Sequence, residues 1–134
     1  MAQTNPYTNY RNARVSTINR GDMVVLVYDA AIKYLEEVKI CMQKKDYNGK
    51  GMYMDRAFAA INELRTSLSF DYDRKIAESL SQLYFFMTKQ MSNATLKNDI
   101  KSVDVVIDIL KGLKEAWEQA AKNEKSQKPV TAPA

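Results

Sequence analysis

The sequence predicts an all-α protein, folded as an antiparallel, up-and-down four-helix bundle. Its 134 residues include only four glycines and three prolines. Because the prolines lie at positions 6, 129 and 133, none interrupts the stretch between Arg11 and Lys128. In four segments of that stretch, apolar residues recur at intervals of three and four, the period of a helix with one buried face. The breaks between these segments are short, so successive helices must run antiparallel around a single core.

The first helix is predicted over about residues 22–45. Asn19 is its expected N-cap, and the carboxylate of Asp22 in the first turn suits the positive end of the helix dipole. The segment KKDYNGKG is expected to end the helix. Its two lysines favour the negative end of the dipole, and Gly49 and Gly51 allow the chain to turn.

The middle of this helix, MVVLVYDAAIKYL at residues 23–35, carries more apolar surface than one core needs. Its two charged residues, Asp29 and Lys33, fall on one narrow strip, and apolar or aromatic residues fill about 260° of the circumference. A helix packed on a small core needs an apolar stripe only a little wider than ~100°. Leu26 and Tyr28 therefore cannot both face one core, and part of this helix is predicted to contact another chain.

Two further helices are predicted over about residues 52–70 and 74–93. The segment SFDYDR separates them, and Asp71 or Asp73 can cap the later helix. In that helix, LYFFM at residues 83–87 spreads five large apolar or aromatic side chains over more than one face.

The fourth helix is predicted to follow NATLKND, with Thr95 or Asn98 as its N-cap, and to end near residues 117–121. Beside its core stripe it has a second apolar row, formed by Val106, Ile109, Leu113 and Ala116. We therefore divide the chain into a flexible arm at residues 1–18, a bundle at residues 19–122 and a disordered tail at residues 123–134. The tail is too poor in large apolar residues to order itself.

No set of residues suggests catalysis, a metal or a cofactor. The chain has no histidine, which excludes Ser-His-Asp and Cys-His sites and the histidine-containing zinc patterns. The single cysteine, Cys41, cannot form an internal disulfide and is expected to pack as a small apolar side chain in a reducing cytoplasm. A glycine-rich phosphate-binding loop is also absent. We expect neither an enzyme nor a cofactor.

The net charge of +4 does not indicate nucleic-acid binding. The first twenty residues hold three arginines and no acid, and the signs are mixed along the rest, whereas phosphate binding needs basic residues gathered on one face. The longest unbroken apolar run, residues 23–28, is far shorter than the ~20 residues that cross a bilayer, and no signal peptide is visible. We predict a cytoplasmic protein that binds no nucleic acid and does not insert into membranes.

Six segments resemble, in order and spacing, the FliS family of flagellin-specific export chaperones. They are YTNY (7–10), LVYDAAIKYL (26–35), INELRTSLSF (61–70), LYFFM (83–87), NATLKND (93–99) and VIDILKGLKEAW (106–117). The resemblance covers about residues 5–121. This chain departs from the family pattern at Ala30, where glycine is usual, at Asn19-Arg20, which replaces a Ser-Pro pair, and at Thr95, which replaces an asparagine.

The resemblance implies a cytoplasmic chaperone of flagellar type III export. Such a protein binds the disordered C-terminal segment of flagellin in apolar grooves, prevents its premature polymerisation and delivers it to the flagellar export apparatus. The expected partners are the flagellin C-terminal segment, in a 1:1 complex, and a component of the export gate. The resemblance also leaves room for a homodimer in the absence of flagellin. In similar proteins the N-terminal arm can fold over part of the groove when flagellin is absent.

The predicted partner-binding residues lie in the arm and on the surplus apolar faces. Tyr7 and Tyr10 lie three residues apart in the arm, where they either cap the groove or are simply exposed. Asp29 either forms a charge-assisted hydrogen bond with a partner or an arm residue, or faces solvent as an ordinary acid. The other predicted contact residues are Leu26, Tyr28, Leu64, Leu68, Tyr84, Val106, Ile109 and Leu113.

Two alternatives remain open at this point. The first is a helical chaperone or adaptor for another secretion substrate, and the second is a basic nucleic-acid-binding bundle. Salt separates them, because an apolar helix stays in its groove at high salt whereas phosphate contacts are lost.

Overall fold

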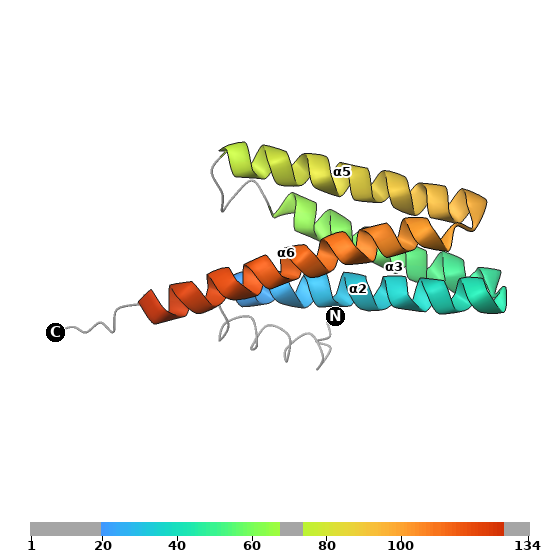
Figure 1. Cartoon of the computed structure of the whole chain (residues 1–134), viewed down its shortest axis with the longest axis horizontal. Coiled ribbons are helices and arrows are strands. Elements are labelled where there is room, and N and C mark those ends of the chain that lie inside the picture. The colour runs from blue at the N-terminus through green and yellow to red at the C-terminus, as the bar shows by residue number, and fades with distance from the viewer. Residues whose placement is uncertain (1–19, 68–73, 128–134) are drawn as a thin grey trace, which may run out of the picture.

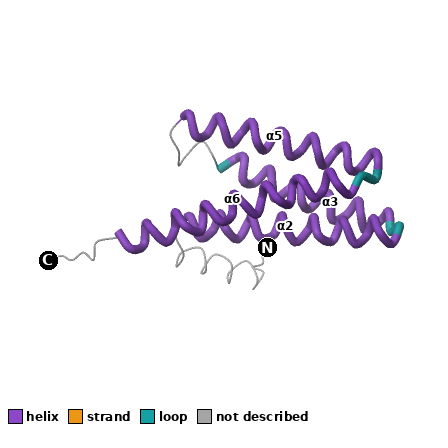
Figure 2. Tube along the Cα trace, in the orientation of Figure 1, coloured by secondary structure: helices purple, strands orange, loops and turns teal. Residues whose placement is uncertain are grey.

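The computed structural model describes residues 20–67 and 74–127, which form four long helices. These are α2 (Arg20–Lys44), α3 (Tyr47–Thr66), α5 (Arg74–Lys97) and α6 (Ile100–Gln127). The helices run alternately in opposite directions along the long axis (Figure 1), and short connections join α2 to α3 and α5 to α6 (Figure 2). The predicted all-α, antiparallel four-helix bundle is confirmed.

The four helices are not packed equally. Each described helix packs against its neighbour along the chain, and α6 closes the bundle against α2. The contacts of α2 with α3 and with α6 are the most extensive, and the contact between α3 and α5 is the least extensive of the four. This inequality leaves the flanks of α5 less covered than those of α2.

One cluster of buried apolar side chains, drawn from all four helices, forms the core. Its removal from water is the main force that holds the helices together. The largest fully buried side chains are Tyr28, Leu35, Val38, Ile61, Tyr84, Met87, Met91, Val103, Val106 and Leu110.

The connection between α2 and α3 differs from the prediction. Gly49 and Gly51 lie inside α3, which begins before residue 52, so the prediction that they form the turn is wrong. Lys45 makes the turn with a φ of 59°, and Asp46 caps α3 by accepting a hydrogen bond from the Gly49 amide at 3.0 Å. Gly49 lies in a crowded place, because a Cβ there would lie 2.5 Å from Asp46 Oδ2 and 2.7 Å from Cys41 Sγ and would force these side chains to shift.

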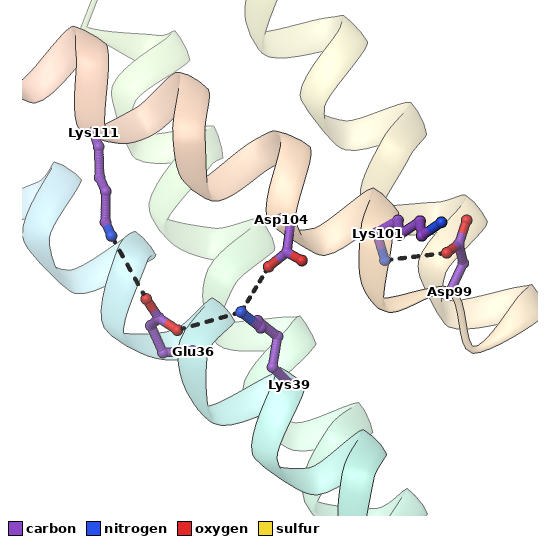
Figure 3. Close-up of polar contacts among 6 residues, drawn as sticks. All are labelled: Glu36, Lys39, Asp99, Lys101, Asp104 and Lys111. Atoms are coloured by element: carbon purple, nitrogen blue, oxygen red, sulfur yellow. Dashed lines mark hydrogen bonds and ion pairs between the residues drawn. The ribbon is translucent and has the colours of Figure 1, made fainter.

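The connection between α5 and α6 also lies later than predicted. α5 continues past residue 93, and the chain turns at Asn98, whose φ is 51°. Asp99 caps α6 in place of the predicted Thr95 or Asn98. Its carboxylate accepts hydrogen bonds from the Lys101 amide at 3.1 Å (Figure 3) and from the Ser102 hydroxyl at 3.0 Å.

A buried lysine ties this connection to α3. Lys50 lies in the first turn of α3, and its Nζ donates hydrogen bonds to Asn98 Oδ1 at 2.7 Å and to the Thr95 carbonyl at 3.2 Å. A buried ammonium is tolerated only when its donors are satisfied. Lys50 thus joins the start of α3 to the end of α5.

Several predictions fall outside the described residues. They are the arm at residues 1–18, the N-cap Asn19, the contact residues Tyr7, Tyr10 and Leu68, the caps Asp71 and Asp73, and residues 128–134 of the tail. α6 reaches Gln127, so the predicted end of the bundle at residue 122 falls within a helix. Within residues 20–67 and 74–127, no helix is long and apolar enough to cross a membrane.

Candidate partner-binding surface

Two predicted contact residues of α2, Leu26 and Tyr28, lie in different surroundings. Tyr28 is completely buried, whereas Leu26 is 47% exposed, which confirms that only one of them faces the core. The Tyr28 hydroxyl shares a hydrogen bond with the Tyr84 hydroxyl and accepts one from the Trp117 indole N–H at 3.2 Å. Burial raises the pKa of Tyr28 above its ordinary value, although these two hydrogen bonds act in the opposite direction. The hydroxyl therefore stays neutral at physiological pH.

Four predicted contact residues lie inside the bundle. Tyr28, Leu64, Tyr84 and Val106 are each at most 2% exposed. They are therefore not accessible on the described surface, and partner binding by them stays a prediction. The two tyrosines can be buried because their hydroxyls bond to each other. Leu64 and Val106 belong to the core cluster to which all four helices contribute.

Ile109 and Leu113 on α6 occupy an intermediate position. Both pack against the core cluster while part of each side chain stays in solvent. With Leu26, they are the predicted apolar contact residues that another chain can reach on the described surface. Partner binding by these three residues stays a prediction.

Asp29 pairs with a lysine of the bundle, and its predicted contact with a partner or an arm residue stays a prediction. Its carboxylate lies 2.7 Å from the ammonium of Lys114 and so ties α2 to α6. The hydrogen bond to Asp29 raises the pKa of Lys114 above its ordinary value, against a smaller opposing effect of burial.

Further along the same two helices, four charged residues meet in a chain of ion pairs, shown in Figure 3. Lys39 of α2 lies 2.6 Å from Asp104 of α6 and 4.0 Å from Glu36 on its own helix. Glu36 lies 3.9 Å from Lys111 of α6. We call these pairs, together with Asp29–Lys114, the α2–α6 ion seam. They cover one side of the core with charges contributed by both helices.

α5 exposes large apolar side chains that the residue-level prediction did not include. Phe85 is 63% exposed, Ile76 50% and Phe86 41%. The signal was present in LYFFM, because neighbours such as Tyr84 and Phe85 point about 100° apart on a helix and cannot both enter the core. Other large apolar residues exposed on the described helices are Ile40, Tyr47, Met52, Leu96 and Val105.

A cavity of about 620 Å³ lies between α3 and α5, and we call it the α3–α5 groove. It is lined by Phe58, Ile61, Asn62, Arg65, Ser81, Gln82, Tyr84, Phe85 and Thr88. Ile61 and Tyr84 are buried and form its apolar floor, whereas Phe58 and Phe85 are more exposed and form its walls. The groove is therefore apolar at its base and mixed at its rim.

Among the residues that the structure describes, the charges at this groove are positive. Arg65 is the one charged residue of this set that lines it, and its Nη2 donates a hydrogen bond to Asn62 Oδ1. At the edge, the Lys89 ammonium lies 5.5 Å from the centre of the Phe85 ring. Within the described part of the chain, neither cation pairs with a carboxylate.

A smaller cavity of about 370 Å³ lies between the start of α2 and the end of α6. Its lining residues are Asp22, Val25, Glu118, Ala121 and Lys122, which carry charges of both signs. Leu26, the exposed residue of α2, directly follows Val25 in the chain.

The described residues offer no arrangement for metal binding or thiol chemistry. They contain no cluster of histidine, cysteine and acidic side chains that could hold a metal ion. Cys41 is buried, and burial, aided by the nearby charges of Asp46 and Glu37, raises the pKa of its thiol. Such a thiol stays protonated and unreactive at neutral pH. Cys41 packs as the sequence predicts.

Comparison with known proteins decides the family. Residues 3–124 match the sequence model of the family described as flagellar protein FliS. The chain belongs to the FliS family. The flagellar secretion chaperone FliS of Vibrio cholerae is 34% identical over 81% of this chain and 79% of its own length. That of Bacillus subtilis is 25% identical over 96% and 95% of the two chains.

A solved structure agrees with the fold. The crystal structure of a flagellar chaperone from bacteria superimposes with a TM-score of 0.74, over 88% of this chain and 96% of the other, at 18% sequence identity. The chain is thus a flagellar export chaperone and not an enzyme.

Proposed function

We propose that this protein binds the disordered C-terminal segment of flagellin in the cytoplasm, in a 1:1 complex. In this role it prevents premature polymerisation of flagellin and delivers it to the flagellar export gate. The observation that carries the proposal is the family match over residues 3–124. The described surface supports it, because large apolar side chains remain exposed on every helix.

The chemistry of that surface suits a disordered client. Leu26, Ile76, Phe85 and Phe86 offer apolar area, and each Å² removed from water contributes about 25 cal/mol. A segment that folds into short helices on this surface buries its own apolar residues against them. The same contacts would hide the apolar residues through which unexported subunits associate.

Calorimetry with a peptide of the flagellin C-terminal segment tests the proposal. We expect 1:1 binding, a gain of helix in the circular dichroism spectrum and a negative heat-capacity change, because apolar surface is buried. If neither heat nor added helix appeared, flagellin would not be the client. A chaperone of another secretion substrate would then be the better assignment.

The N-terminal arm is proposed to cover part of the binding surface in the free protein. Tyr7 and Tyr10 are the residues predicted to make this contact. Deletion of residues 1–15 should increase the binding of an apolar dye to the free protein and speed peptide association. An unchanged dye signal and an unchanged rate would exclude a covering role for the arm.

Leu26 and Tyr28 separate binding from stability on α2. Leu26 is exposed and Tyr28 is buried, so Leu26→Ala should keep the melting temperature and lower flagellin affinity about tenfold, or ~1.4 kcal/mol. Tyr28→Ala should instead destabilise the fold. Unchanged affinity of Leu26→Ala would remove this part of α2 from the binding surface.

A further inference from the structure

We propose that the α3–α5 groove binds one amphipathic helical stretch of the exported client and selects it by charge. An apolar side chain of this stretch lies between Phe58 and Phe85, and a carboxylate about one turn away pairs with Arg65. The inference rests on the proposed function, because the client that it describes is the flagellin C-terminal segment. It adds the residues and the chemical rule by which one part of that segment is recognised.

The shape of the groove favours a helix as the occupant. Its volume of about 620 Å³ is that of a ligand site, with room for several side chains of a partner and not for a whole helix. Both walls belong to α-helices, whose main-chain groups are already paired within each helix, so no strand edge is offered. Recognition must therefore use side chains, as when the apolar face of a helix enters a groove.

The residues that form the floor and walls of the groove differ in exposure, with a buried apolar floor between more exposed aromatic walls. Tyr84 and Phe85 are consecutive, yet Tyr84 is 2% exposed at the floor and Phe85 is 63% exposed at the rim. Phe58, across the groove on α3, is partly buried against the core cluster. Two aromatic rings thus flank an apolar floor and leave space between them. An apolar side chain placed there would lose contact with water.

The charges identify the chemistry of the occupant. Within residues 20–67 and 74–127, no acidic residue lines the groove, and Arg65 is the single charged residue that does. Lys89 adds a second positive charge at the edge, over the ring of Phe85. A guanidinium can hold a carboxylate through two parallel hydrogen bonds, which gives both strength and orientation. An acidic amphipathic stretch is therefore attracted, and a basic one is repelled.

Arg65→Met tests the charge rule with little change in side-chain length. The client is a peptide of the flagellin C-terminal segment from the same organism. We expect Arg65→Met to weaken binding about tenfold at low salt. The difference should shrink at 1 M salt, where the Debye length is about 3 Å. The matched control is Arg56→Met, which removes an exposed arginine of the same helix that does not line the groove. It should bind as the wild type does.

Charge reversal identifies the partner carboxylate. Each acidic residue of the peptide is changed in turn to lysine and tested against Arg65→Glu. One of these changes should restore the affinity that Arg65→Glu loses, and the others should not. Phe85→Ala should weaken binding at both salt concentrations, because its contact is apolar. Thermal unfolding of each variant shows that the fold is retained, since both side chains lie at the surface.

The outcomes separate this inference from the proposed function. If the wild type binds the peptide and Arg65→Met, Arg65→Glu and Phe85→Ala bind it equally well, the groove is not used, although flagellin remains the client. If the wild type does not bind the peptide, both proposals fail. If the free protein is a dimer that Phe85→Asp dissociates, the groove is an interface between two copies of the chain, and the inference is overturned.

Discussion

Along the boundary between α2 and α6, lysines and carboxylates of both helices meet over the core, whereas the boundary between α3 and α5 stays open. Asp29 and Lys39 of α2 each lie less than 3 Å from an oppositely charged atom of α6. At the α3–α5 groove, Arg65 and Lys89 have no such partner within the described part of the chain. Ion pairs join α2 to α6 along the middle of their boundary, whereas the α3–α5 groove offers unused apolar and charged groups.

The contrast shows how a small bundle can be both stable and a chaperone. The extensive packing of α2 on α3 and α6 holds the fold. The α3–α5 pair has the least extensive contact and contains the larger cavity. Client surface can therefore be added beside α5 without disturbing the packing of α2. The predictions below test this division between a closed side, at the α2–α6 boundary, and an open side, at the α3–α5 groove.

The largest effect is expected from two consecutive residues of α5. Tyr84→Ala removes a buried aromatic ring and should destabilise the protein by about 3–5 kcal/mol. Phe85→Ala removes a mostly exposed ring and should change stability by less than ~0.5 kcal/mol. Urea unfolding of both variants measures the difference. Similar losses would mean that Phe85 belongs to the core and that the groove is closed.

Lys50 holds the α3–α5 pair together at the end away from the groove. Lys50→Met keeps the aliphatic stem but removes the two hydrogen bonds to Asn98 and Thr95. Because the donor is charged, the loss should be about 1.5–3 kcal/mol in urea unfolding. Lys33→Met, an exposed lysine of α2, is the control and should have little effect. Equal midpoints for the two variants would show that Lys50 does not join the helices.

A smaller loss is expected at the hydrogen bonds inside the core. Tyr28→Phe keeps the ring but removes the hydroxyl that meets Tyr84 and Trp117, and it should destabilise the fold by about 1 kcal/mol. Trp117 is the only tryptophan, so its emission should shift when the indole N–H loses this acceptor. Tyr34→Phe, at a half-buried tyrosine stacked on Tyr53, is the control and should change neither property. An unchanged emission would contradict the bond.

The sequence predicts the closed side of the molecule better than the open side. The helix number and direction follow from apolar periodicity, and Leu26 and Tyr28 differ in exposure as their spacing requires. Periodicity cannot tell, however, which part of a wide apolar arc is covered. Periodicity therefore assigns Tyr84 and Val106 to the surplus apolar faces, although neighbouring helices bury them. The role proposed for Arg65 could not be predicted for a related reason, because the groove that it lines forms only when α3 and α5 lie side by side.

The two turns show a second limit. KKDYNGKG contains two glycines, which makes them the obvious turn residues, but Lys45 turns the chain and Asp46 caps the next helix. Asp46 accepts a hydrogen bond from the Gly49 amide, so the helix starts as soon as a cap is available. The sequence alone does not show whether the chain turns at a glycine or starts the next helix at a capping residue.

The smallest effect is expected in the α2–α6 ion seam. Lys39→Met removes the ammonium that lies 2.6 Å from Asp104. Asp104 is nearly half exposed, so the loss should be only about 0.2–1 kcal/mol at low salt. It should become smaller at 1 M salt, because dissolved ions weaken the interaction between partly exposed charges. Lys33→Met, on the same helix, provides the control for loss of one positive charge.

The pH dependence of the Lys39→Met effect gives the ion seam a second, independent signature. The hydrogen bond to Asp104 raises the pKa of Lys39 above its value of 10.5 in the unfolded chain. A raised pKa in the folded state means that the pair stabilises the fold fully below pH 10.5 and loses this contribution as pH rises through the folded value. The stability difference between wild type and Lys39→Met should therefore be constant from neutral pH to about pH 9 and decline above 10.5. A stability difference that persisted at high salt and high pH would come from packing of the lysine stem. The Lys39–Asp104 ion pair would then not contribute to the stability of the α2–α6 contact.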